Sequence, residues 1–323
     1  MRVIFEHHYL SRLVSVMAVV AVQVMPTLSY AQAPQADGAS GPDSVIVVTG
    51  NREKRDQKAR AISRISSQED GVLPRFYMAL CPLVLGMPAI ASERVRSLIQ
   101  KVSREVGLPA ADANCVVNVI VTVTPPGQGS TFVKKISKER RAYFSIRPVE
   151  KQALLNNPGP IWNWYITDIK QANGIPVRQI SSISIGGEER FVGPGAYVID
   201  QVSGSRLGAS IRSDIATAFI VFDGAKANEL GVEKIANLSA FLALAKIDIR
   251  QSSQIHDATI LKATINNDTD DQLSSFDLNY LQGMYLASKG STASNVIQTI
   301  LSRIEKFKCD FADDRKPACV STK

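Results

Sequence analysis

Histidine is scarce in this chain, which limits the acid–base and metal chemistry that it can support. The 323 residues include three histidines, and two of them, His7 and His8, lie in a segment with the composition of a cleavable export signal. A mature chain would keep His256, so a multi-histidine zinc centre within one chain is excluded, and we expect no metal site and no cofactor. Asp257 follows His256, and an imidazole beside a carboxylate suits general-base catalysis. His256 and Asp257 are therefore the candidates for a catalytic pair; ordinary surface residues are the alternative.

Four cysteines form the second set of reactive side chains. Cys81, Cys115, Cys309 and Cys319 are an even number in an exported chain, which allows three disulfide pairings. None of them shows the C-x-x-C spacing of a redox centre or a zinc ribbon. We expect the disulfides Cys81–Cys115 and Cys309–Cys319, because each joins near neighbours in the sequence; four reduced, buried thiols are the alternative.

Other motifs that carry chemistry are missing from the sequence. There is no G-x-G-x-x-G, P-loop, G-x-S-x-G or EF-hand pattern in a fitting context. The acidic run 266–271 lacks the spaced ligands of a calcium loop, and Gly186-Gly187 lies between predicted strands, as an ordinary turn does. The net charge of +7 does not indicate nucleic-acid binding, because the basic excess lies near the N-terminus and the aromatic residues have the pattern of a strand core.

The first 31 residues have the three-part layout of a secretory signal peptide. Two arginines flank a polar start, an apolar run covers residues 13–25, and both Ser29-Tyr30-Ala31 and Ala31-Gln32-Ala33 fit the cleavage rule. Because the apolar run is shorter than the roughly 20 residues that span a bilayer, we expect cleavage rather than a retained anchor. With no second apolar stretch of that length, the mature chain is expected in the periplasm or outside the cell.

Residues 32–72 are expected to form a flexible basic linker. This segment starts with small and polar residues and then carries six basic side chains against two acidic ones between Arg52 and Arg64. A charge run of this kind is usually a solvated tether. Contact with an acidic surface, such as anionic lipid or polysaccharide, is the alternative.

One part of this linker is strongly β-branched. It consists of Val45, Ile46, Val47, Val48, Thr49 and Gly50 and precedes a basic stretch. The segment resembles the TonB box near the mature N-terminus of TonB-dependent outer-membrane receptors, which implies that it adds as a strand to a periplasmic partner protein. The chain is too short for the plug and the 22-stranded barrel of such a receptor. The alternative is a short strand that pairs with this protein's own domain.

Residues 73–323 are predicted to form a single α+β domain: a mixed β-sheet with one early helix packed on it and a C-terminal helical block. The early helix ends at Gly107, and the Asn173-Gly174 turn predicts a hairpin that joins strands 161–169 and 179–185. Apolar patterns predict further strands at 115–124 and 215–222, a largely buried helix at 230–247, and helical stripes at 273–285 and 296–307.

Several short motifs resemble those of a group of secreted Gram-negative proteins of unknown function. The motifs are Arg75-Phe76, Cys81-Pro82 with Gly86-Met87-Pro88, Cys115-Val116-Val117-Asn118, Gly159-Pro160-Ile161, and residues 273–278 (L-S-S-F-D-L) with Met284-Tyr285. They cover most of the chain from Arg75 and are structural in type. The resemblance therefore implies a fold more than an activity.

The C-terminal third is also similar, more remotely, to exported zinc-metallopeptidase-like (zincin-like) domains. In a zincin the buried helix carries H-E-x-x-H, because two histidines four apart share a helix face and the glutamate activates a metal-bound water. The matching stretch here is residues 235–242 (I-A-N-L-S-A-F-L), which has neither a histidine nor an acid. This resemblance implies a scaffold that has lost its metal.

Together these patterns favour an exported, non-catalytic envelope protein that acts as a binding or scaffold module. The expected partner is an envelope protein that binds the N-terminal tether. The alternative is a periplasmic or secreted hydrolase without a recognisable motif that uses His256. No pattern in the sequence indicates the oligomeric state.

Overall fold

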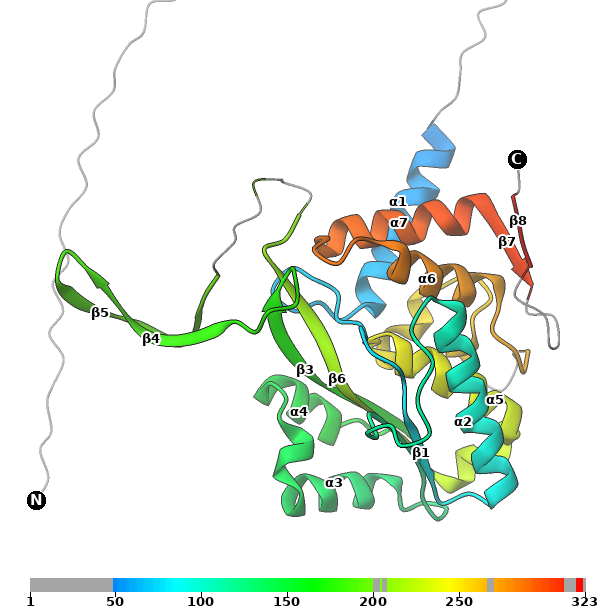
Figure 1. Ribbon diagram of the computed structural model, residues 1–323. Helices are drawn as coiled ribbons and strands as arrows, with labels where there is room; N and C mark the ends of the chain where they lie inside the picture. The colour runs from blue at the N-terminus through cyan, green and yellow to red at the C-terminus, as the bar shows by residue number, and fades with distance from the viewer. Residues whose placement is uncertain (1–48, 200–203, 205–207, 266–269, 311–317, 322–323) are drawn as a thin grey trace, which may run out of the picture. The chain divides into compact units, whose positions relative to one another are not determined.

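A four-stranded mixed sheet lies at the centre of the computed structural model, which describes residues 49–199, 204, 208–265, 270–310 and 318–321 (Figure 1). These residues belong to one unit, Val48–Lys323. The strand order is β1-β2-β6-β3, with β1 (Pro82–Leu85), β2 (Val119–Val123) and β6 (Ile211–Phe222) parallel and β3 (Ile161–Gln171) antiparallel to β6. The α+β class with a mixed sheet is confirmed.

Helices cover both faces of this sheet. α2 (Ala89–Glu105) and α5 (Gly224–Leu244) pack on one face, and α3 (Gly129–Glu139) and α4 (Pro148–Leu155) pack on the other (Figure 1). Because β2 and β6 lie between two helix layers, both of their faces can be apolar, as in a buried parallel sheet. α6 (Ser275–Leu286) and α7 (Ala293–Lys306) complete the predicted C-terminal helical block, after the 3₁₀ turns η2 (Ile249–Gln254) and η3 (Ile260–Thr264).

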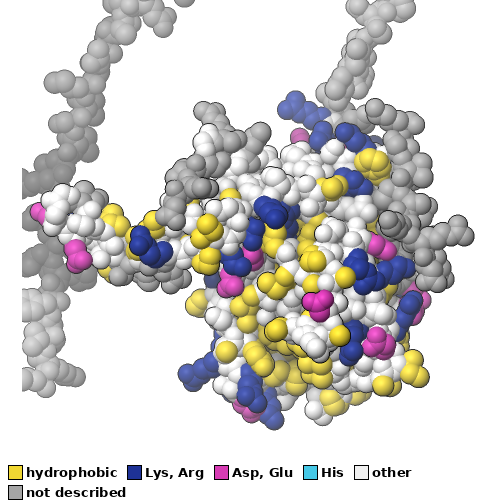
Figure 2. Space-filling view, viewed as in Figure 1, with side chains coloured by type: hydrophobic (Ala, Val, Ile, Leu, Met, Phe, Trp, Pro, Cys, Tyr) yellow, Lys and Arg dark blue, Asp and Glu magenta, His cyan; other side chains and the backbone are white. Residues whose placement is uncertain are grey.

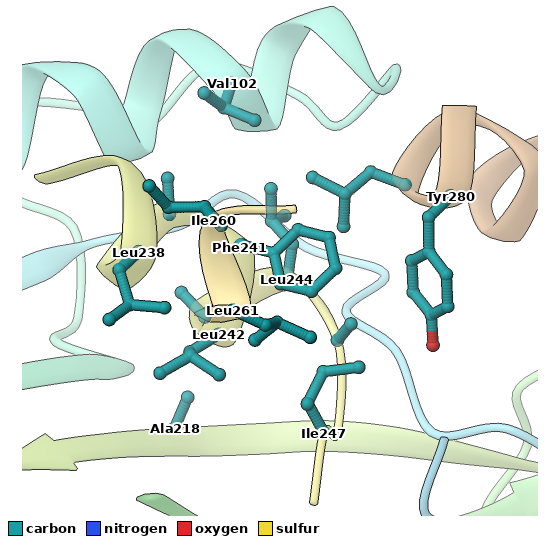
Figure 3. Close-up of a cluster of buried hydrophobic side chains, with 14 of the residues drawn as sticks. Val102, Ala218, Leu238, Phe241, Leu242, Leu244, Ile247, Ile260, Leu261 and Tyr280 are labelled. Carbon is teal, nitrogen blue, oxygen red and sulfur yellow. The ribbon is translucent and has the colours of Figure 1, made fainter. Parts of the chain in front are cut away.

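The main core is built around α5. Every residue from Lys234 to Leu244 is buried. Figure 3 shows Phe241 and its helix neighbours enclosed between Val102 of α2 and Ala218 of β6, with Tyr280 of α6 at the side. The helix is apolar on most faces because protein surrounds it on most faces.

A smaller, aromatic core lies under α3 and α4 on the opposite face of the sheet. The Trp164 ring stacks on Phe219, with centroids 4.8 Å apart and planes 2° from parallel. Phe144 stacks on Trp164 at the same centroid distance, and the Trp164 indole N–H donates to the Tyr143 carbonyl at 2.7 Å. Together the two cores cover both faces of the central strands β2 and β6.

Three polar residues in the motifs of the proposed family resemblance have structural roles. Arg75 donates to the carbonyls that end α6, including those of residues 287 and 288 at 2.9 Å each. Asn118 accepts from the Cys81 N–H at 2.7 Å. The buried Asp277 carboxylate accepts from the backbone N–H groups of Ser274 and Ile260 at 2.9 Å each, and burial raises its pKa despite these bonds. These side chains hold neighbouring elements together.

α1 (Thr49–Ile65) is part of the folded unit, whereas the composition of residues 32–72 predicts a flexible basic linker. Ile62 and Ile65 are buried in the main core, and the Ser66 hydroxyl lies 2.7 Å from the Tyr280 hydroxyl. The charged residues of α1 lie on the faces that these contacts leave free. The difference arises because a few apolar residues at helical spacing anchor a segment whose average composition is that of a tether.

Two hairpins complete the described chain. β4 (Arg178–Ile185) and β5 (Glu188–Val198) pair through the turn at Gly186-Gly187, and β7 (Phe307–Asp310) pairs with β8 (Ala318–Ser321). The predicted hairpin between strands 161–169 and 179–185 is wrong, because β3 pairs with β6 and β4 with β5. Asn173-Gly174 does form a turn, which closes with the Gly174 N–H donating to the Gln171 carbonyl at 2.7 Å.

The disulfide Cys81–Cys115 is confirmed. It closes a sequence separation of 34 residues around α2 and ties the start of β1 to the segment that leads into β2. In the β7–β8 ladder, Cys309 lies opposite Cys319. This register agrees with the second expected pair, which stays a prediction because the side chains of these two cysteines are outside the described set.

Candidate functional site

Polar and charged side chains surround α1, which also lies beside His256 and Asp257. We define the α1 surface as Arg52, Lys54, Arg55, Asp56 and Lys58 of α1 with Gln298 and Glu305 of α7; these residues line a hollow of ≈ 780 Å³. Four of the seven side chains are cationic and two are anionic. The hollow therefore has a positive lining, which favours an anionic ligand.

Contacts with α7 and with Asp257 help to fix α1 in place. Arg55 lies 3.5 Å from the Glu305 carboxylate of α7 and donates to Gln298 at 3.3 Å. Lys58 forms an ion pair with Asp257 at 2.8 Å. These pairs are largely exposed, so each contributes at most about 1 kcal/mol, and the burial of Ile62 and Ile65 supplies the main anchor.

The proposed partner-binding residues Val45, Ile46, Val47 and Val48 lie outside the described residues. Thr49 and Gly50 are the first residues of α1. A strand that includes all six residues would therefore require the first turn of the helix to unwind, whereas residues 45–48 alone would not.

His256 and Asp257 lie beside α1, at a second hollow of ≈ 240 Å³. His256 is exposed, and its backbone carbonyl accepts a hydrogen bond from the Lys262 ammonium group at 3.1 Å. The Asp257 carboxylate accepts a hydrogen bond from the Lys58 ammonium group. The lining residues of this hollow include no serine, threonine or cysteine that could act as a nucleophile. The geometry thus gives Asp257 a role in holding α1.

Asp223 lies at the carboxyl ends of the parallel strands and bonds the loop that follows β2. Open α/β sheets ordinarily bind ligands at this edge. Asp223 follows β6, and its carboxylate accepts from the N–H groups of Gly127, Gly129 and Ala225 at 2.8, 2.9 and 3.0 Å. Burial alone would raise the pKa of Asp223, but these three donors outweigh it and hold the pKa below its usual value. The start of α3, which could attract an anion, already faces the protein's own carboxylate.

Close backbone contacts seal the same edge. A Cβ on Gly224 would lie 2.3 Å from the Thr124 carbonyl oxygen, and a Cβ on Gly129 would lie 2.3 Å from the Trp162 ring. Gly86, with φ +78°, would place a Cβ 1.9 Å from the Val123 carbonyl oxygen. Even a methyl group does not fit at these three positions, so the backbone segments at this edge lie in direct contact.

A small polar cavity of ≈ 80 Å³ lies between α4, β3 and residues 246–250. Lys246 forms ion pairs there with Glu69 and, at 3.0 Å, with Glu150. The Arg250 guanidinium donates two hydrogen bonds to the Asp248 carboxylate, at 2.7 and 2.8 Å. Burial alone would raise the pKa of Glu150, but bonds from Arg147 and Lys246 lower it below the usual value. The cavity has room for roughly six waters, far less than a typical ligand pocket, and its charges are paired within the protein.

The stretch that corresponds to the metal-binding helix of a zincin is sealed. Residues 235–242 lie in α5 and are 0–3% exposed. Within the described ranges, no group of three or more His, Cys, Asp or Glu side chains is placed to hold a metal ion. None of the helices in those ranges is long and apolar enough to cross a membrane.

Two features of the site, Asp223 and the charge network of Lys246, were not predicted from the sequence. Asp223 could have been suspected from its place after a buried strand and directly before a glycine, the position of a helix N-cap. The charge network of Lys246 joins residues 69, 150 and 246, and no local pattern brings these residues together.

No protein-family model, no curated protein and no solved structure matches this chain.

Proposed function

We propose that this protein is an exported, non-catalytic module that binds at the cell envelope through its N-terminal part. The observation that carries the proposal is that two places where sheets and buried helices often hold a catalytic centre are filled by this protein's own residues. Asp223 occupies the carboxyl edge of the sheet, and α5 is enclosed at residues 235–242. A domain filled in this way is suited to binding a partner through its outer surface.

Two further observations support export to the periplasm or the exterior. The first 31 residues have the layout of a signal peptide, and the Cys81–Cys115 disulfide belongs in an oxidising compartment. We include in this proposal the resemblance to secreted Gram-negative proteins, which implies export. We also include the resemblance to zincin-like domains, which implies a scaffold that has lost its metal.

The proposed contact with a partner protein is the β-branched run Val45–Val48, which resembles a TonB box. A short β-branched segment in front of a folded body can add to the sheet edge of another protein, with its main chain supplying the hydrogen bonds. The described chain begins directly after this run with α1, whose Ile62 and Ile65 are buried in the main core.

Photo-cross-linking in intact envelopes tests this contact. A photoreactive residue at position 46 of the full chain should form an adduct with one envelope protein, and replacement of Val45–Val48 by Gly and Ser should remove it. The matched control is the same residue at Val149, which is 70% exposed on α4 and should form no such adduct. An identical adduct from both positions, or none from position 46, would reject the proposal.

A further inference from the structure

The N-terminal half of α1 projects from the body of the protein. Residues 52–57 are all exposed, which is unusual for two successive turns of a helix packed on a core. In Figure 1 the blue helix continues past α7, and Figure 2 shows dark-blue Lys and Arg side chains grouped where it leaves the body. This half of the helix can lie against an extended surface without obstruction from the globule.

The charge of α1 is only partly compensated. The helix carries six basic and two acidic residues. Arg55 and Lys58 pair with Glu305 and Asp257, whereas the other four cations have no carboxylate partner among the described residues. One of those four, Arg60, bonds only a carbonyl of its own helix, so its charge is free to act on a ligand.

The chemistry of these side chains suits phosphate. A cluster of four to eight Lys and Arg residues on an amphipathic helix is typical of binding to anionic lipid headgroups, and the arginine fork matches phosphate oxygens. Residues 52–65 include no exposed large apolar side chain, so the contact would be electrostatic and superficial rather than inserted. The positive hollow of the α1 surface gives individual phosphates a place to enter.

We propose that the α1 surface, together with the exposed Arg60 of the same helix, binds the phosphate groups of an anionic phospholipid surface. This contact goes beyond the proposed function, because it concerns lipid rather than a partner protein and uses residues 52–60 rather than 45–48. It would hold the protein at a membrane face.

Vesicle sedimentation with the full chain, purified after export, tests the proposal. The protein should bind vesicles of phosphatidylcholine with one-third phosphatidylglycerol and not pure phosphatidylcholine, and high salt should release it. The variant Arg52→Gln, Lys54→Gln, Arg60→Gln should bind about 100-fold more weakly, because each cation near an anionic surface contributes roughly fivefold. Circular dichroism should be unchanged, because these side chains are exposed and form no ion pair in the described structure.

α3 offers a matched control with the same charge change. Lys134, Lys135 and Lys138 are exposed on a helix that does not project, and their replacement by Gln should weaken binding by about threefold at most, through net charge alone. An equal loss in both variants would overturn the proposal, as would binding that is insensitive to salt. Binding to soluble inorganic polyphosphate without binding to the vesicles would also overturn it. The adduct at position 46 is measured separately, so failure of one proposal does not imply failure of the other.

Discussion

The substitution Asp223→Ala tests the closure of the sheet edge. It removes a buried carboxylate that accepts three backbone N–H bonds of 2.8 to 3.0 Å and leaves the Gly127 and Gly129 N–H groups without this acceptor. Hydrogen bonds to a charged group contribute roughly 1.5 kcal/mol each and add incompletely, so we expect a loss of about 3 kcal/mol in the free energy of unfolding at pH 7. Urea unfolding followed by circular dichroism measures this loss.

The pH dependence of the same variant checks its cause. Because the folded-state pKa of Asp223 is lowered, the stabilisation is present above the unfolded pKa of about 4 and is lost as the pH falls through the folded-state pKa. The difference between wild type and Asp223→Ala should therefore shrink in acid. Asp112→Ala, at an exposed carboxylate, is the control and should cost less than about 0.5 kcal/mol. A loss under about 1 kcal/mol at pH 7, or a difference that persists unchanged in acid, would refute the reasoning.

Three further substitutions test other parts of the structure. Replacement of Cys81 and Cys115 by Ser should lower the free energy of unfolding by about 4 kcal/mol, the loop-closure value for a separation of 34 residues, and dithiothreitol should destabilise the wild type but not the variant. Gly86→Ala should destabilise far more than Gly127→Ala in urea unfolding, because both have φ near +75° but only the Gly86 methyl would meet a backbone carbonyl; equal losses would contradict this contact. Lys246→Met should cost about 3 kcal/mol at neutral pH and less in acid, because it leaves two partly buried carboxylates without their shared cation, and a thermal shift at both pH values measures it.

Elements with a strong local pattern are predictable from the sequence. The β-branched run 115–124 contains β2, and the apolar spacing of Val95, Leu98 and Val102 identifies α2. In both cases one residue pattern reports directly on burial, because the element is packed against the core along its whole length. The Cys81–Cys115 pair follows from the same local reasoning.

Features that depend on distant contacts are not predictable in this way. The Asn173-Gly174 signal specifies a turn, but the partner of β3 is β6, which is set by packing in the sheet. Asp223 gains its role from N–H groups more than 90 residues earlier in the chain. The anchoring of α1 likewise requires the core that surrounds Ile62, while its local composition is dominated by charge.

The β4–β5 hairpin creates a risk of self-association. Among the described strands none pairs with its outer edges, and Phe191 is 76% exposed on it. Free edges of this kind can template further strands, and charged residues are the usual protection against such growth. Glu188, Glu189 and Arg190 lie beside the turn in the sequence and are exposed. Their charges act as gatekeepers, so the tolerance of this protein to crowding and high concentration depends on a few side chains far from its core.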